Sequence, residues 1–200
     1  MKGVAIASSK GGTGKTSLSH LLALGAAWNN VPSYLMHTDN REPIRVQGRP
    51  YLYYDARTPE TLATLVESAV NQDGLCIIDG GGNRPEFDNW IASAVDLVLI
   101  PVSPDQESAT LAISDRERML KSGATDCRYI LNNVSTNAKA RAFDQTAFYD
   151  QLDQDLILGE VKAVAAVKRL GIPDQEPFST PPSNLNKLSR VFYDLVSKNL

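Results

Sequence analysis

The chain has 200 residues, of which 42% are hydrophobic and 22% charged, and its formal net charge is −3. These values are ordinary for a globular protein, and the length suits one domain over residues 1–200. The weak negative charge excludes a protein that is basic overall, so contact with nucleic acid would need a local basic patch. No stretch approaches a membrane span, and the first apolar run is too short for a secretory signal.

The two cysteines, Cys76 and Cys127, lie beside strand-like apolar runs. Their spacing suggests neither a zinc site nor a disulfide framework, so we expect two buried free thiols. Free thiols favour a reducing compartment, and the sequence therefore predicts a cytoplasmic protein.

The first predicted strand, residues 4–7, leads into a glycine-rich stretch at residues 8–17 and then a helical pattern. A strand, a glycine loop and a helix in this order form the context of a phosphate-binding loop. Glycines let backbone N–H groups approach phosphate oxygens, and the helix N-terminus adds partial positive charge. We expect Lys15 to contact the β- and γ-phosphates of ATP and the Thr16 hydroxyl to bind Mg²⁺. The expected nucleotide contacts in this loop are Lys10, Gly11, Gly12, Thr13, Gly14, Lys15, Thr16 and Ser17.

The rest of the chain alternates strand and helix patterns. Apolar runs predict strands at residues 34–37, 51–54, 75–78, 97–102, 129–132 and 156–158. Helical patterns follow the glycine loop, begin again at Thr58, and cover about residues 105–121 and 139–152 before a last helix near the C-terminus. This alternation predicts an α/β fold of the P-loop NTPase type, a mostly parallel twisted sheet with helices on both faces.

Two aspartates follow predicted strands, where ligands gather in such sheets. Asp79 ends the run at residues 75–78, as a Walker B aspartate does, and would hold Mg²⁺ through water. Capping of a strand-end turn is the alternative. The glycines at residues 80–82 would let the next loop move, or form a plain turn. Asp39 follows the strand at residues 34–37.

The sequence K-G-G-T-G-K-T at residues 10–16 resembles the deviant Walker A box of the ParA/MinD ATPases, although Ser9 replaces the first glycine of the general P-loop. In that family the first lysine, here Lys10, reaches the nucleotide of the partner subunit. The resemblance therefore implies an ATP-dependent homodimer with ATP and Mg²⁺ as cofactors. It also makes Lys10 and Lys15 catalytic.

Two further roles follow from the resemblance. The family has a D-x-D-P-Q-like box whose second acid positions the attacking water. Here the box becomes residues 37–41, with His37 in place of the first acid and Asp39 in place of the second. Asp39 is therefore expected to orient water or contact hydrated Mg²⁺, and a surface turn is the alternative. Asn132 corresponds to the asparagine that reads the adenine edge, or to a strand-end turn.

The C-terminal part bears on what an ATPase of this kind would act on. From Lys139 onward, eight basic residues balance eight acidic ones, so there is no basic tail. We expect Lys162 and Arg169 to share one helix face, and Lys187, Arg190 and Lys198 to lie near one face of the last helix. Such a patch, doubled in a dimer, would bind DNA without sequence specificity. An ordinary solvated face is the alternative.

The leading hypothesis is a ParA-like ATPase that dimerises on ATP and partitions DNA, with a ParB-like adaptor or cargo protein as partner. It would be cytoplasmic, and nucleoid-associated if it binds DNA. The alternatives are positioning of a protein cargo on the nucleoid, a MinD-like membrane-surface switch, and an ATP-dependent ligase or metal-transfer ATPase. Leu185, Leu188, Phe192 and Leu195 form an apolar stripe on the last helix. This stripe favours packing on the sheet over binding to a membrane.

Overall fold

The computed structural model describes residues 1–81, 85–174 and 182–200. Within these residues, seven strands form one parallel sheet in the order β3-β2-β4-β1-β5-β6-β7. The strands are β1 (Lys2–Ile6), β2 (Ser33–His37), β3 (Leu52–Asp55), β4 (Leu75–Asp79), β5 (Leu97–Val102), β6 (Cys127–Val134) and β7 (Ile157–Lys162). The helices are α1 (Lys15–Trp28), α2 (Pro59–Val70), α3 (Pro85–Ala94), α4 (Gln106–Lys121), α5 (Ala138–Asp144) and α6 (Ser183–Ser197).

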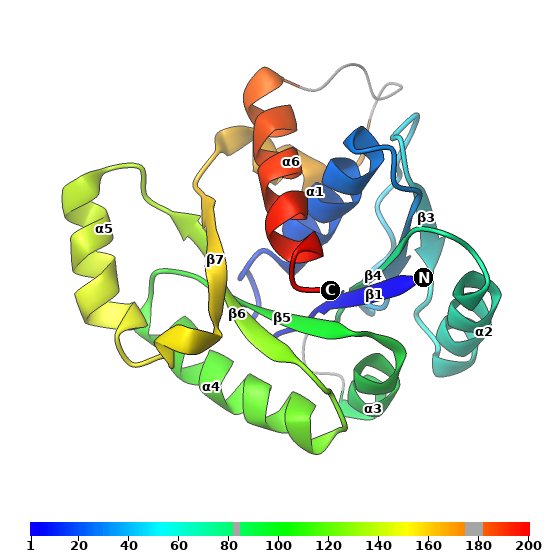
Figure 1. Ribbon diagram of the computed structural model, residues 1–200, viewed down its shortest axis with the longest axis horizontal. Helices are drawn as coiled ribbons and strands as arrows, with labels where there is room; N and C mark the ends of the chain where they lie inside the picture. Colours follow the sequence, from blue (N-terminus) through cyan, green and yellow to red (C-terminus); the bar gives the residue numbers. More distant parts are fainter. Residues whose placement is uncertain (82–84, 175–181) are drawn as a thin grey trace.

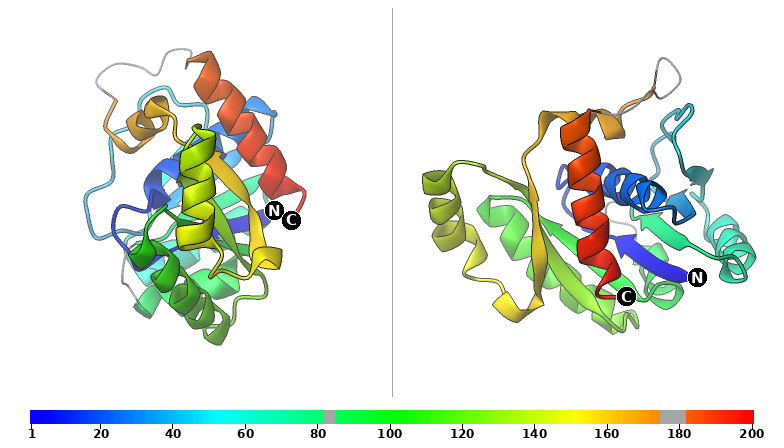
Figure 2. Two further views of the ribbon diagram at one scale, coloured as in Figure 1. Left: turned by 90° about the vertical axis from the view of Figure 1, so that its left-hand side faces the viewer. Right: turned by 45° about the horizontal axis from the view of Figure 1, so that its top comes forward.

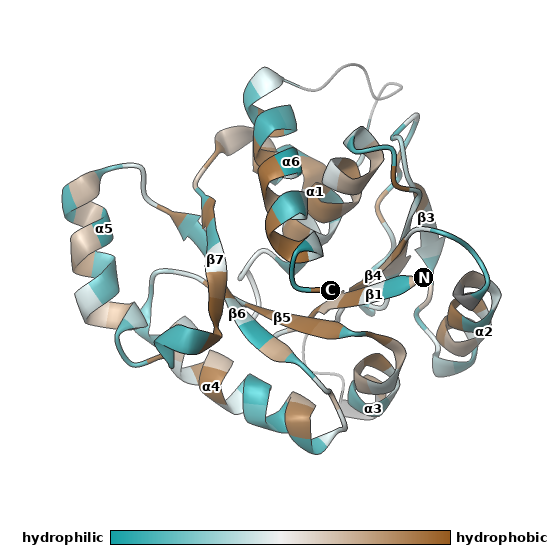
Figure 3. Cartoon of the chain, viewed as in Figure 1, coloured by the Kyte–Doolittle hydropathy of each residue, from teal (hydrophilic) through white to brown (hydrophobic). Residues whose placement is uncertain are grey.

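The central strands are buried on both faces, which explains their continuous apolar sequences. Successive residues of a strand point to opposite faces. Val4 and Ile6 accordingly belong to one apolar core, and Ala5 and Ala7 belong to the other. These strands are mostly brown in Figure 3. Cys76 and Cys127 are buried free thiols, as expected, and burial raises the pKa of each to about 12.

Helices cover both faces of the sheet (Figures 1 and 2). Helices α1 and α6 lie side by side on one face, and α2, α3 and α4 lie on the other. At Gly25 of α1 a Cβ atom would come 2.0 Å from the Ser189 carbonyl oxygen of α6, so glycine permits this close approach. Leu185 and Phe192 of α6 are buried in the same core as α1. The apolar stripe of the last helix therefore packs inside the protein.

Several predicted elements differ from the structure. Helix α3 lies where no element was predicted, and the helix predicted over 139–152 is α5 followed by a π-helical turn, Gln145–Tyr149. Strand β7 extends beyond residues 156–158 to Lys162. Lys162 and Arg169 do not share a helix face, because the chain ends β7 at Lys162 and turns into a separate 3₁₀ segment, Ala165–Gly171. Of the glycines at 80–82, Gly82 lies outside the described residues.

The strand order brings three chain segments together at one edge of the sheet. Strand β4 lies between β1 and β2, and its last residue, Asp79, pairs with Ile6 on one side and His37 on the other. The loop after β1 leads into α1 at this same edge. The residues predicted to bind ligand therefore start from adjacent strand ends.

Candidate functional site

The glycine loop between β1 and α1 has the backbone that its sequence predicts. Gly12 and Gly14 have positive φ angles of 80° and 92°, in the left-handed region that favours glycine. A Cβ on Gly14 would come 2.3 Å from the Asn132 Nδ2 atom. No side chain of the described residues caps α1 at Gly14. The first N–H groups of this helix have no intrahelical acceptor and can bind an anion.

Lys15 begins α1 and is buried beside this loop. Its Nζ donates a hydrogen bond to the Lys10 carbonyl oxygen at 2.9 Å. Burial lowers the pKa of Lys15, and the nearby carboxylates of Asp79 and Asp39 act in the opposite direction. A buried cation therefore lies next to the loop amides, where it could contact a phosphate.

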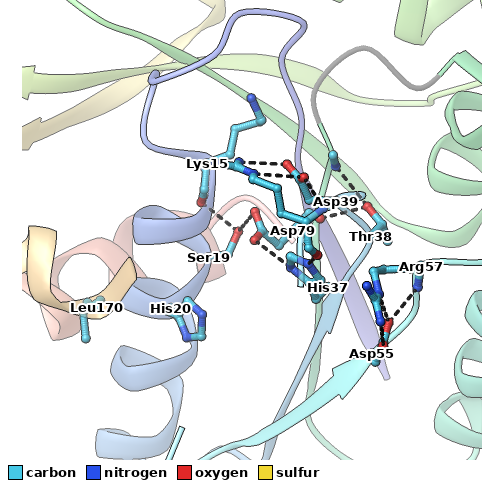
Figure 4. A network of polar contacts seen from close by, with 12 residues as sticks. Lys15, Ser19, His20, His37, Thr38, Asp39, Asp55, Arg57, Asp79 and Leu170 are labelled. Atoms are coloured by element: carbon cyan, nitrogen blue, oxygen red, sulfur yellow. Dashed lines mark hydrogen bonds and ion pairs between the residues drawn. The ribbon is translucent and has the colours of Figure 1, made fainter. Parts of the chain in front are cut away.

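Asp79 is almost fully buried at the end of β4 (Figure 4). The Ser19 Oγ atom lies 3.4 Å from Asp79 Oδ1 and 2.9 Å from the Lys15 carbonyl oxygen. Within the described residues, Asp79 Oδ2 has no hydrogen-bond partner. Leaving such an oxygen without a partner is costly, and a hydrated Mg²⁺ would satisfy it. Thr16 lines the adjacent cavity, so Thr16 and Asp79 fit a magnesium ion.

His37 lies between Asp79 and the segment that contains Arg41, just after β2. Its Nε2 atom is 2.9 Å from the Arg41 carbonyl oxygen, and its Nδ1 atom is 3.7 Å from Asp79 Oδ2. Burial acts to lower the pKa of His37, but Asp79 and the Arg41 carbonyl outweigh it, and the pKa is raised.

Asp39 lies just beyond β2 and forms a bidentate ion pair with Arg41. The Arg41 Nε and Nη2 atoms donate to the two carboxylate oxygens at 3.1 and 2.9 Å. The Arg41 guanidinium holds the pKa of Asp39 well below its usual range. Asp39 is therefore ionised while it pairs with Arg41, and its two oxygens have about four acceptor sites, so it can still accept a hydrogen bond from a water.

Lys10 is held by the N-terminal region of α4. Its Nζ pairs with Asp105 and with Glu107 Oε2, the latter at 3.1 Å. Burial acts to lower the pKa of Lys10, whereas the two carboxylates raise it above its ordinary value. Lys10 thus points to its own chain in this structure of a single chain.

The side chain of Asn132 lies close to the glycine loop, as expected of a nucleotide contact. Its Nδ2 atom donates to the Thr13 carbonyl oxygen at 2.7 Å, so part of the amide stabilises the loop itself. The amide also lines a cavity of about 470 Å³ together with Ser103. Its role in reading adenine stays a prediction.

Two cavities lie over the glycine loop, with volumes of about 350 and 470 Å³. Both volumes are in the range of small-molecule sites. Their linings share Gly12, Gly14, Ser17 and Lys168. The smaller cavity lies on the side of Lys15, Thr16 and His37, and the larger lies on the side of Asn132. The site can therefore take an elongated ligand with its phosphates at the loop.

No protein-family model matches the sequence, and no curated protein matches it. Solved structures do match. A plasmid partition protein of Borrelia burgdorferi B31 bound to AMPPNP has a TM-score of 0.70 and 12% identity, over 100% of this chain and 99% of that one. MinD of Aquifex aeolicus has a TM-score of 0.70 and 17% identity, over 99% and 98%. An ATP complex of McdA from Cyanothece has a TM-score of 0.65 and 16% identity, over 98% and 95%.

The chain has the ParA/MinD fold. The expected α/β fold of the P-loop NTPase type is confirmed, and the sheet is entirely parallel within the described residues.

The sequence patterns do not indicate two residues that shape the site of this ParA/MinD fold. Asp115 of α4 is buried and accepts a hydrogen bond from Ser9 N at 2.8 Å, which anchors the start of the loop. Asp115 interrupts an apolar helix face that includes Ala112 and Met119, and a lone acid on such a face is a detectable signal. Thr38 Oγ1 donates to the Asp79 carbonyl oxygen at 2.9 Å and joins the ends of β2 and β4.

The predicted basic residues of α6 are exposed. Lys187, Arg190 and Lys198 all face solvent, with the exposed Asp194 among them. No helix of the described residues is long and apolar enough to cross a membrane.

Proposed function

We propose that this chain is a Mg²⁺-dependent ATPase that dimerises when it binds ATP and partitions DNA in the manner of ParA-type proteins. One arrangement carries the proposal: the glycine loop, Lys15 and the buried carboxylate of Asp79 meet at adjacent strand ends, with a second lysine, Lys10, in the same loop. The AMPPNP-bound partition protein and the ATP-bound McdA among the structural neighbours support it.

The chemistry needs little beyond these residues, because phosphoryl transfer depends mainly on positioning and on stabilising charge. Lys15 and the loop amides would bind the phosphates. Thr16 and Asp79 would hold Mg²⁺, which neutralises charge on the phosphate oxygens when it is bound. Asp39 would orient the attacking water. Lys10 of a partner subunit would add positive charge at the γ-phosphate, as an arginine finger does in trans.

Nucleotide binding and dimerisation test the core of the proposal. We expect the purified protein to bind a fluorescent ATP analogue with Mg²⁺ and to form a dimer in light scattering when AMPPNP saturates it. Lys10→Ala should leave nucleotide affinity within about threefold and lower steady-state hydrolysis at least tenfold, since one charge-assisted contact is worth about 1.5–3 kcal/mol. Lys121→Ala, at an exposed lysine of α4, is the matched control. Full hydrolysis by Lys10→Ala would contradict the role in trans.

We expect DNA to be the surface on which this ATPase acts. Lys187, Arg190 and Lys198 are exposed on α6, and pairing two subunits would double this patch. With AMPPNP, we expect binding to random duplex DNA that weakens as salt rises. The double variant Lys187→Ala with Arg190→Ala should bind more weakly and with a shallower salt dependence, by about one unit of slope for each lost phosphate contact. DNA binding that is equal with ADP and AMPPNP would contradict ATP-dependent partition.

A MinD-like membrane switch is the second candidate, because MinD proteins are also among the structural neighbours. The buried apolar stripe of α6 disfavours that helix as a membrane anchor. Anionic liposomes in the same assay separate the two candidates: nucleotide-dependent binding to liposomes alone would favour the switch. A strain that lacks this protein shows whether a plasmid depends on it. If the protein binds DNA but the strain keeps its plasmids, positioning of a protein cargo through an adaptor would be favoured.

A further inference from the structure

Arg41 lies in the wall of the smaller cavity, which Lys15 and Thr16 also line. It follows β2, and its side chain is 80% exposed. Burial and the positive charge of Arg41 both act to lower the pKa of Lys15, so the two cations lie close enough to repel each other. Two cations beside one cavity make it attractive to an anion.

The acidic residue in this wall does not cancel these charges. Among the described residues that line the smaller cavity, Glu42 is the only acid. Its Oε1 atom accepts a hydrogen bond from Arg57 Nη1 at 2.8 Å, so it already has a cation as partner. Lys168 adds a third cation to the same lining. The wall therefore carries an excess of positive charge, which suits the phosphates of a nucleotide.

The contacts of Arg41 occupy only one edge of its guanidinium group. Its Nε and Nη2 atoms donate to the two carboxylate oxygens of Asp39 at 3.1 and 2.9 Å. A guanidinium has five N–H donors in one plane. Within the part of the chain that the structure describes, Arg41 Nη1 has no hydrogen-bond partner. Asp39 thus fixes the direction of this side chain and leaves the Nη1 edge open.

A second pair in this protein has the same geometry and uses its remaining edge. Asp55 and Arg57 have the same spacing at the end of β3 (Figure 4). The N, Nε and Nη2 atoms of Arg57 donate to Asp55, which repeats the contacts of the Arg41 pair. Arg57 Nη1 then donates to a second carboxylate, that of Glu42. An arginine held in this way can therefore bind two anions at once.

The arrangement of the two cavities indicates which phosphate Arg41 would meet. Asn132 lines the larger cavity, and Arg41 lines only the smaller one. The glycine loop lies between them, because Gly12 and Gly14 line both. A nucleotide with its base in the larger cavity would cross the loop, and its last phosphate would lie in the smaller cavity on the side of Arg41.

We propose that Arg41, held by Asp39, binds the γ-phosphate of ATP through the Nη1 edge of its guanidinium and thereby selects ATP over ADP. This inference deepens the proposed function and rests on it. Arginine suits the task, because its planar group binds phosphate oxygens with fixed geometry as well as with charge. The pair with Asp39 persists when the phosphate binds.

The affinities for two nucleotides test this contact. A fluorescent ADP analogue is displaced by ADP or by AMPPNP, with Mg²⁺ present and at protein concentrations at which light scattering shows a monomer. Arg41→Ala should lower the affinity for AMPPNP about 10–100-fold, as expected for a charged hydrogen bond. It should leave the affinity for ADP within about threefold, because ADP has no γ-phosphate.

Arg45→Ala is the matched control. Arg45 is an exposed arginine of the same β2–β3 connection and lines neither cavity, so this variant should bind both nucleotides as the wild type does. Equal losses for ADP and AMPPNP in Arg41→Ala, or no loss for either, would overturn the inference while the proposed function stands. Wild-type protein that binds neither nucleotide would contradict the proposed function and, with it, this inference.

Discussion

Lys10 and Lys15 belong to one loop but have different surroundings. Lys15 is buried and donates to the Lys10 carbonyl, whereas the Lys10 side chain pairs with Asp105 and Glu107. The two cations are therefore kept apart. Lys15 stays beside the loop amides, where the proposed function needs it, and Lys10 would have to leave its carboxylate partners before it could act elsewhere.

Removing the cation of Lys15 tests its placement. Lys15→Met keeps the apolar stem and removes the charge, and we expect ADP affinity to fall about 10–100-fold, since a charged hydrogen bond is worth about 1.5–3 kcal/mol. The fold should tolerate the change, because burial disfavours the charged amine and lowers its pKa. Titration with fluorescent ADP and a thermal melt measure both quantities. Lys121→Met is the control, and equal affinities of the two variants would contradict the placement.

The buried His20 predicts how stability depends on pH. Burial, together with the charge of Arg49, lowers the pKa of His20 well below its ordinary value. The folded chain therefore leaves this ring neutral, whereas the unfolded chain protonates it below about pH 6.5. The free energy of unfolding should fall as the pH falls below that value, by up to about 1.4 kcal/mol per pH unit from this group.

Urea denaturation at pH 7, 6 and 5 measures the slope. His20→Asn places an amide oxygen near Nδ1, which accepts from Arg49 Nη1 at 3.2 Å, but it cannot titrate. This variant should show a shallower fall in stability toward pH 5. His37 has a raised pKa and acts in the opposite direction, but it is present in both proteins. An unchanged slope would contradict the buried neutral state of His20.

The start of α4 depends on a carboxylate with two partners. Asp105 Oδ1 accepts from Ser108 N at 2.8 Å, which caps the helix, and the same side chain pairs with Lys10. Asparagine is an equally good cap but carries no charge. Asp105→Asn therefore separates the cap from the ion pair.

We expect Asp105→Ala to lower the free energy of unfolding by about 1 kcal/mol and Asp105→Asn to change it by less than about half of that. Both variants remove one of the two carboxylates that hold Lys10, and Glu107 remains. If Lys10 acts in the partner subunit, both should lower the AMPPNP concentration for half-maximal dimerisation, by up to about fivefold for a half-exposed ion pair. Urea denaturation and light scattering measure the two effects. Weaker dimerisation of both variants would instead assign Asp105 to the interface.

Local patterns explain which elements the sequence predicts. Strands β4 and β5 are continuous apolar runs, and the Thr58 cap of α2 is a short local signal, so all three are predicted. Helix α3 is short, and its buried apolar residues, Phe87, Ile91 and Ala92, extend over little more than one turn, so the helical pattern is weak. Strand β7 carries alternating polar residues near its end at the edge of the sheet, so only its apolar start is detected.

The same reasoning applies to the site. The glycine loop is predictable because its residues are consecutive, and Asp79 because it ends an apolar strand. Pairings between distant residues are not predictable from one sequence. Lys10 meets Asp105 across 95 positions, and Arg49 meets Asp174 across 125. Only the folded sheet brings these partners together.

Arg49 joins two connections that are far apart in the chain. Its side chain is 1% exposed, and its Nε and Nη2 atoms donate to the two oxygens of Asp174 at 2.7 and 2.9 Å. Nη1 donates to the Leu170 carbonyl oxygen at 2.9 Å. The β2–β3 connection and the segment after β7 both line the cavity beside Lys15, so this cluster joins two of its walls.

Breaking one side of this buried pair should be costly. Arg49→Met leaves Asp174 without its cation, and we expect the free energy of unfolding to fall by about 3–5 kcal/mol, measured by urea denaturation. Adding Asp174→Leu to this variant should recover part of the loss, because the unpaired charge is removed as well. The matched control is Arg141→Met, whose pair with Glu160 is exposed and worth about 0–1 kcal/mol. Equal losses in Arg49→Met and Arg141→Met would mean that the two connections are held by their apolar contacts alone. A large loss in Arg49→Met that Asp174→Leu relieves would show that the wall of the cavity beside Lys15 depends on one buried ion pair.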